Sequence, residues 1–233
     1  MTLAYSLVHS DCVQILSDAA HYLPDGTLVD IQQKVHTSPF IPLAVISVGS
    51  SAVGKAVCEG IVELSEIGSF DMTISLAAQV VERLKGHVPT GHDFMLIISG
   101  ISENRGPSHF VAFTKPPYDA PAYTLFHPGT PDIGSGAIIN PDDIAAMGVT
   151  PQMAQAAGRD FLRLYGAVFA EHMRRKKMQN WMAPEKPPLH GIGGFLELTT
   201  VTTNGCETER LKTWTEDRIG QKINPVSMEV VAA

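Results

Sequence analysis

The sequence has few of the features that stabilise small folds by disulfide bonds or bound metal ions. Only three of its 233 residues are cysteines, and Cys12, Cys58 and Cys206 show no metal-ligand spacing. An odd, scattered set of this kind is typical of a protein kept in a reducing compartment, so we expect a cytoplasmic location. The nine histidines form no ligand pattern either. We therefore expect no metal site and no other cofactor.

Long apolar runs and an excess of basic residues are also absent. No stretch approaches the roughly 18 apolar residues that indicate a membrane helix, and the N-terminus lacks the basic start and apolar core of a signal peptide. The formal net charge is -7, which disfavours a nucleic-acid-binding surface. The one basic cluster, residues 174–177, falls at the end of an expected helix, where it would complement the helix dipole. We expect neither a membrane nor a nucleic acid as partner.

What is present is the composition of an ordinary globular protein. Hydrophobic residues make up 44% and charged residues 18% of the chain. A chain of this length buries well over half of its unfolded surface without a disulfide or metal. Because the sequence has no internal repeat and no long linker, we expect a single domain over residues 1–233.

The expected strands are grouped in hairpins, and the helices lie between these groups. Turn residues at Pro24-Asp25-Gly26 and Asn204-Gly205 separate strand-like runs. The expected strands cover residues 3–8, 13–17, 29–35, 43–48, 94–99, 109–113, 122–126, 195–202 and 207–214. The expected helices cover residues 52–64, 71–84 (with Asp71 as N-cap) and 151–177. This order disfavours a doubly wound parallel sheet and favours an α+β fold, with two antiparallel sheets packed together and helices outside both faces.

The N-terminal part carries a constellation with regular spacing. Asp18 follows Thr2 by sixteen residues, and Lys34 follows Asp18 by sixteen more. A glycine turn at Gly49 precedes the first helix, and a Gly-Ser-Gly turn surrounds Ser135. In these features the sequence resembles the proteasome β subunits and the related bacterial ATP-dependent ring protease, a family of N-terminal-nucleophile hydrolases.

The resemblance implies a four-layer αββα sandwich and a threonine hydrolase that cleaves peptide or amide bonds. Thr2 would become the N-terminal nucleophile once Met1 is removed, its hydroxyl attacking a carbonyl while its α-amine takes the proton. Lys34 would favour the neutral amine by like-charge repulsion, and Asp18 would hold Lys34. The resemblance also implies a homo-oligomeric ring and leaves an ATPase partner open.

The resemblance also assigns supporting roles and reveals two departures. The Gly49 N–H would be the oxyanion donor, and Ser135 would support the amine. Before the glycine pair at residues 193–194, Leu189 and Ile192 stand where the family has Asp and Ser. His190 is either a substitute for them or a structural residue beside the glycine. A second interpretation is therefore a catalytically inactive ring subunit or binding module, and a third is an amidase or acylase acting on small molecules.

A different class of function remains open at residues 49–55. They fit the G-x-x-x-x-G-K pattern of a phosphate loop, between an expected strand and an expected helix. Ala56 replaces the Ser or Thr that would bind magnesium in such a nucleotide binder. Otherwise Lys55 is a solvent-exposed residue of the first helix.

Overall fold

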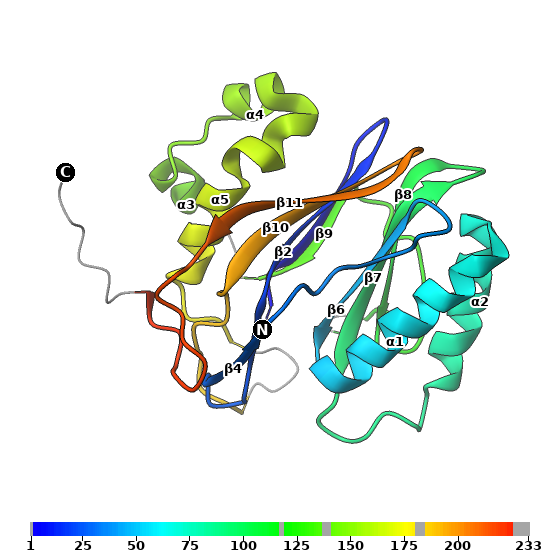
Figure 1. Cartoon of the computed structure of the whole chain (residues 1–233), viewed down its shortest axis with the longest axis horizontal. Coiled ribbons are helices and arrows are strands. Elements are labelled where there is room, and N and C mark those ends of the chain that lie inside the picture. Colours follow the sequence, from blue (N-terminus) through cyan, green and yellow to red (C-terminus); the bar gives the residue numbers. More distant parts are fainter. Residues whose placement is uncertain (1, 117–118, 137–140, 180–184, 226–233) are drawn as a thin grey trace.

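The computed structural model describes residues 2–116, 119–136, 141–179 and 185–225, which form two large antiparallel sheets, a small sheet and a set of helices (Figure 1). The first large sheet has the strand order β11-β10-β2-β1-β9. Its strands are β1 (Ala4–Val8), β2 (Val13–Asp18), β9 (Asp132–Ser135), β10 (Phe195–Thr202) and β11 (Gly205–Thr213). The second has the order β5-β6-β7-β8, with β5 (His36–Thr37), β6 (Leu43–Gly49), β7 (Phe94–Ser102) and β8 (Gly106–Phe113). The small sheet pairs β3 (Ala20–Tyr22) with β4 (Leu28–Ile31).

The two large sheets pack face to face through an apolar core. Successive side chains on a strand point to opposite faces of the sheet, so neighbours in β2 enter different cores. Ile15 packs with Ile46 and Ile97 of the second sheet, whereas Leu16 packs with the helical layer on the other side. This alternation explains why β2 is buried along its whole length.

Helices cover the outer face of each sheet (Figure 1). Helices α1 (Ser51–Leu64) and α2 (Phe70–Arg83), joined by the 3-10 helix η1 (Ser65–Ile67), pack on β6 and β7. Helix α5 (Phe161–Arg174) packs on β2 and β10, preceded by α3 (Pro141–Ala146), α4 (Pro151–Ala157) and η2 (Gly158–Asp160). The predicted combination of antiparallel sheets and helices in an α+β chain agrees with this structure. Among the described residues no helix has both the length and the apolar character needed to cross a membrane.

Most local predictions are confirmed. The first hairpin is β1 paired with β2, and the last is β10 paired with β11 around Asn204-Gly205. The first helix begins one residue earlier than predicted, at Ser51. All three cysteines are free. These segments combine a strong local pattern with a partner close in sequence.

Four predicted elements are wrong in extent. Residues 122–126 make only an isolated bridge, through Phe126, and no strand. Of the run at 29–35, residues 29–31 belong to β4 and residues 32–35 are not a strand, and β5 begins only after the run, at His36. The Gly-Ser-Gly segment is not a turn, because Gly134 and Ser135 lie in β9. The long helix at 151–177 is interrupted at Gly158, whose φ is +52°, and α5 ends at Arg174.

One predicted helix cap is also wrong, and the basic helix end has an additional contact. Ser69 rather than Asp71 caps α2, its side chain accepting a hydrogen bond from the Met72 N–H, and Asp71 lies in the first turn. The basic cluster predicted at a helix end does begin in the last turn of α5, at Arg174. The side chain of Arg174 is fully buried, and it makes a tertiary ion pair with Asp217 that its position in the sequence did not predict.

Candidate active site

Thr2, Lys34 and Asp18 meet at the start of the first strand. The Lys34 Nζ donates to the Thr2 Oγ1 over 3.0 Å and to the Asp18 Oδ1 over 2.9 Å. The hairpin accounts for half of this geometry, because the pairing of Ala4 with Ser17 places the start of β1 beside the end of β2. The sixteen-residue spacing of Thr2 and Asp18 thus corresponds to one β-hairpin, whose two strands bring these residues close together.

Asp18 is buried and fully engaged. Its Oδ1 accepts from the Leu3 N–H at 2.9 Å in addition to Lys34, and its Oδ2 accepts from the Ala20 and Gly193 N–H groups at 3.1 Å each. Buried carboxylates are tolerated when every oxygen is paired in this way. Asp18 therefore fixes the ammonium group of Lys34 relative to two backbone segments.

Lys34 lies in the segment between β4 and β5, and its side chain is only 5% exposed. Burial lowers the pKa of its ammonium group, and the charge and hydrogen bond of Asp18 partly oppose that effect. Desolvation penalises the charged form of an amine, which makes it a better proton donor than an exposed lysine. Lys34 thus donates a hydrogen bond to the Thr2 hydroxyl from a buried position that Asp18 holds in place.

Thr2 lines a cleft of about 650 Å³. The cleft is lined by β3 and the turn after it, by the segment around Lys34, by the β6–α1 junction, and by residues 185–187 and 189. Gly49 lines it at the end of β6, with a φ of +125° that favours glycine. The structure therefore places the predicted nucleophile and the predicted oxyanion donor on one cleft.

Ser135 lies beside this centre but not on the cleft. It ends β9, where it pairs with Ala4 of β1, two residues from Thr2. Its Oγ is buried and has no hydrogen-bond partner within the described part of the chain. Met1, to which the α-nitrogen of Thr2 is attached, lies outside the described residues. The predicted contact of Ser135 with the amine therefore stays a prediction.

The residues at the two departures have other roles. Leu189 lines the cleft and exchanges backbone hydrogen bonds with Met178. Ile192 is fully buried in the core under α5. The His190 Nδ1 donates to the carbonyl oxygen of Arg174 at 3.0 Å, so this ring is engaged away from Thr2.

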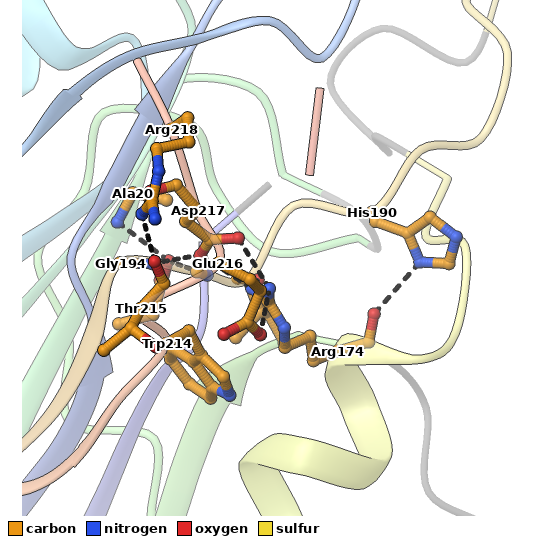
Figure 2. A network of polar contacts seen from close by, with 12 residues as sticks. Ala20, Arg174, His190, Gly194, Trp214, Thr215, Glu216, Asp217 and Arg218 are labelled. Atoms are coloured by element: carbon orange, nitrogen blue, oxygen red, sulfur yellow. Dashed lines mark hydrogen bonds and ion pairs between the residues drawn. The ribbon is translucent and has the colours of Figure 1, made fainter. Parts of the chain in front are cut away.

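A polar network behind the glycine pair had no signal in the sequence. Arg174 at the end of α5 binds Asp217 and Glu216, and Asp217 binds the Gly194 N–H (Figure 2). Only the glycine pair itself, at residues 193–194, pointed to this region. Arg174 and Asp217 are 43 residues apart in the sequence, and neither belongs to a motif.

The phosphate-loop pattern has an unfavourable context. β6 lies between antiparallel neighbours, whereas nucleotide-binding loops of this type belong to mainly parallel sheets. Gly54 packs directly on Ser47, and Lys55 is half exposed with Glu59 at 3.9 Å. These contacts favour the simpler interpretation of Lys55 as a residue of the helix surface.

No family model matches the sequence, and no curated protein matches it. The likeness to the proteasome β subunits therefore rests on the residues described above.

Proposed function

We propose that the chain is an N-terminal threonine hydrolase, with Thr2 as nucleophile after Met1 is removed. The observation that carries the proposal is the Lys34 Nζ, held by buried Asp18 within 3.0 Å of the Thr2 Oγ1 at a cleft. On this proposal the two facing sheets with helices outside form the four-layer αββα sandwich of that family.

The reaction would proceed through an ester. The α-amine of Thr2 takes the hydroxyl proton while Oγ1 attacks the carbonyl carbon of a peptide or small amide. Lys34 stabilises the negative charge that develops on Oγ1, and the Gly49 N–H is the candidate donor to the carbonyl oxygen. The amide C–N bond breaks as the leaving amine takes the proton. Water, deprotonated by the same α-amine, then hydrolyses the ester and restores the hydroxyl.

Ser135 fits this scheme as a partner for the free amine. Its Oγ is buried beside β1 without a hydrogen-bond partner in the described residues, and a buried hydroxyl without a partner is uncommon. A free α-amine at Thr2 would offer that partner.

The same resemblance supports the wider proposal of a cytoplasmic homo-oligomeric ring acting on peptides or small amides, with an ATPase partner left open. The rival proposal is a catalytically inactive ring subunit or binding module of the same fold. Leu189 and Ile192 favour it, because neither offers a polar atom in place of the Asp and Ser of the family.

Two measurements on protein from its native source test the hydrolase proposal. Intact mass spectrometry should show loss of Met1, and a β-lactone probe should then add one acyl group at Thr2. Thr2→Ala should abolish this labelling, and Thr2→Ser should retain it. Quantitative retention of Met1, or labelling that persists in Thr2→Ala, would remove Thr2 as the nucleophile.

A further inference from the structure

Arg174 and Asp217 form a bidentate ion pair inside the protein. The Arg174 Nη1 lies 2.9 Å from Asp217 Oδ2, and Nη2 lies 2.6 Å from Oδ1. The side chains are 0% and 2% exposed, and the Trp214 ring lies under the guanidinium at 4.8 Å. Burying such a pair carries a large desolvation cost, so burial by itself is weak evidence for a stabilising role. The other contacts of this ion pair indicate a second role for it.

The pair holds the backbone on both sides of Gly193. The Arg174 Nη1 donates to the Ile192 carbonyl oxygen at 2.5 Å, and the Gly194 N–H donates to the Asp217 Oδ2 at 2.6 Å. A Cβ atom on Gly193 would lie 2.5 Å from that same Oδ2. The ion pair therefore packs directly against Gly193 and fixes the peptide groups that flank it.

Gly193 in turn fixes Asp18. Its N–H donates to the Asp18 Oδ2 at 3.1 Å, and its carbonyl accepts from the Ala19 N–H at 3.1 Å. Asp18 binds Lys34 through its other oxygen, and Lys34 reaches Thr2. An unbroken series of contacts thus runs from the end of α5 to the candidate nucleophile.

We propose that Arg174 and Asp217 are positioning residues, which hold Asp18 and Lys34 in line with Thr2 through Gly193. This role rests on the proposed function. It also accounts for the two departures, because support for the site comes from behind the glycine pair and not from the side chains at positions 189 and 192.

The test variant is Asp217→Asn, which keeps the size of the side chain and removes its charge. The matched control is Asp143→Asn. Asp143 is also buried and binds His172 at 2.8 Å and the Lys176 ammonium group near the same helix end, and within the described residues it does not contact the glycine pair. Both variants remove a carboxylate from an ion pair near this helix end, although Lys176 is 31% exposed and Arg174 is fully buried. Asp143→Asn therefore controls for the loss of an ion pair in this region, and amide exchange at Leu198 reports general destabilisation in each variant.

The first readout is the rate of Thr2 labelling by the β-lactone probe. Asp217→Asn should lower the maximal labelling rate about 10- to 100-fold, because a small misplacement of reacting groups has effects of this size. The probe concentration for half-maximal rate should change less than about twofold, since neither residue 174 nor 217 lines the cleft. Asp143→Asn should match the wild type in both values.

The second readout does not depend on activity. Amide exchange at Gly193 should become at least about tenfold faster in Asp217→Asn, while the core amide of Leu198 and the Asp143→Asn control change far less. The 15N resonance of the Lys34 ammonium group should move in the same variant. If wild-type Thr2 is not labelled, the proposed hydrolase function fails, and these spectra still decide whether the ion pair positions Lys34.

Arg174→Lys provides a second variant should Asp217→Asn fail to fold. It keeps a cation beside Asp217 but lacks the planar fork that reaches both Asp217 and the Ile192 carbonyl. It should show the same faster exchange at Gly193. Spectra of the folded variants that match Asp143→Asn at Gly193 and Lys34 would overturn the proposal.

Discussion

The Nζ of Lys34 lies 2.9 Å from the Oδ1 of Asp18, and the two side chains are 5% and 0% exposed. Aspartate–lysine pairs at the ends of strands are usually exposed and contribute little to stability. This one is buried and receives three further backbone donors at Asp18. Its chemistry therefore differs from that of a surface pair.

Lys34→Met should be strongly destabilising, because it leaves the buried Asp18 charge without a counter-ion. Breaking such a pair costs about 3–5 kcal/mol, and the three remaining N–H donors favour the lower end of that range. Lys55→Met is the matched control, since the contact of Lys55 with Glu59 is half exposed. That change should stay within about 0.5 kcal/mol. Urea unfolding of both variants measures the difference, and equal losses would contradict the burial argument.

Gly194→Ala should destabilise the fold for two reasons, the left-handed backbone conformation at this position and a steric clash of the added Cβ. Gly194 has a φ of +75°, and its added Cβ would lie 2.6 Å from the Ile31 Cγ2. The left-handed backbone alone costs about 1–2 kcal/mol for an L-residue. Gly60→Ala is the opposite case, because a Cβ there meets nothing within 4 Å and the residue lies inside α1.

Gly60→Ala should accordingly stabilise the protein by about 0.5–1 kcal/mol through helix propensity. Thermal unfolding of the two variants beside the wild type should move the midpoint in opposite directions. A neutral Gly194→Ala would show that this backbone position is not constrained.

The sequence predicted the parts of the site that depend on neighbouring strands. Thr2 and Asp18 meet because one hairpin brings them together, and the local pattern of that hairpin is strong. Arg174 and Asp217 could not be predicted, because their contact joins a helix end to a segment beyond the last strand. Nothing in composition or spacing distinguishes a buried arginine from the exposed basic residues that follow it.

The errors in the predicted secondary structure have a similar cause. Residues 122–126 have high β propensity, but within the structure only Phe126 finds a ladder partner, Val111. Strand formation depends on a neighbouring strand more than on intrinsic preference. Likewise, the apolar periodicity of 151–177 continues across Gly158, where the backbone itself turns. Periodicity alone cannot reveal such a break.

The three cysteines should be unreactive in the folded protein. Burial is the main cause that raises the pKa of the Cys12 and Cys206 thiols to about 11 and that of Cys58 to about 12. Because the thiolate is the nucleophile, iodoacetamide at about pH 7.5 should modify the native protein slowly and the urea-unfolded protein quickly. Mass spectrometry over time distinguishes the two rates. Fast native alkylation at Cys58 would contradict its burial and would complicate assignment of β-lactone labelling to Thr2.

The protein should lose stability as the pH falls below about 6.5, and His109 should contribute to that loss. Its ring is fully buried. The Nε2–H donates to the Thr130 carbonyl oxygen at 3.0 Å, so Nδ1 accepts from the Ser6 hydroxyl at 3.1 Å. Burial is the main cause that lowers the pKa of His109, with His127 acting in the same direction and Asp132 and the Thr130 bond opposing it.

The sign of the effect follows from this lowered pKa. Between the folded pKa and the ordinary value near 6.5, the unfolded chain binds more protons than the folded one, so stability decreases as the pH falls through this window. Burial also lowers the pKa values of His21 and His36, so removing one ring reduces the loss without abolishing it. The free energy of unfolding should therefore fall less between about pH 7.5 and pH 5.5 in His109→Gln than in the wild type. Replacing the exposed His87 by Gln should leave the wild-type loss unchanged, and a loss in His109→Gln as large as the wild type's would show that His109 is not one of the groups responsible.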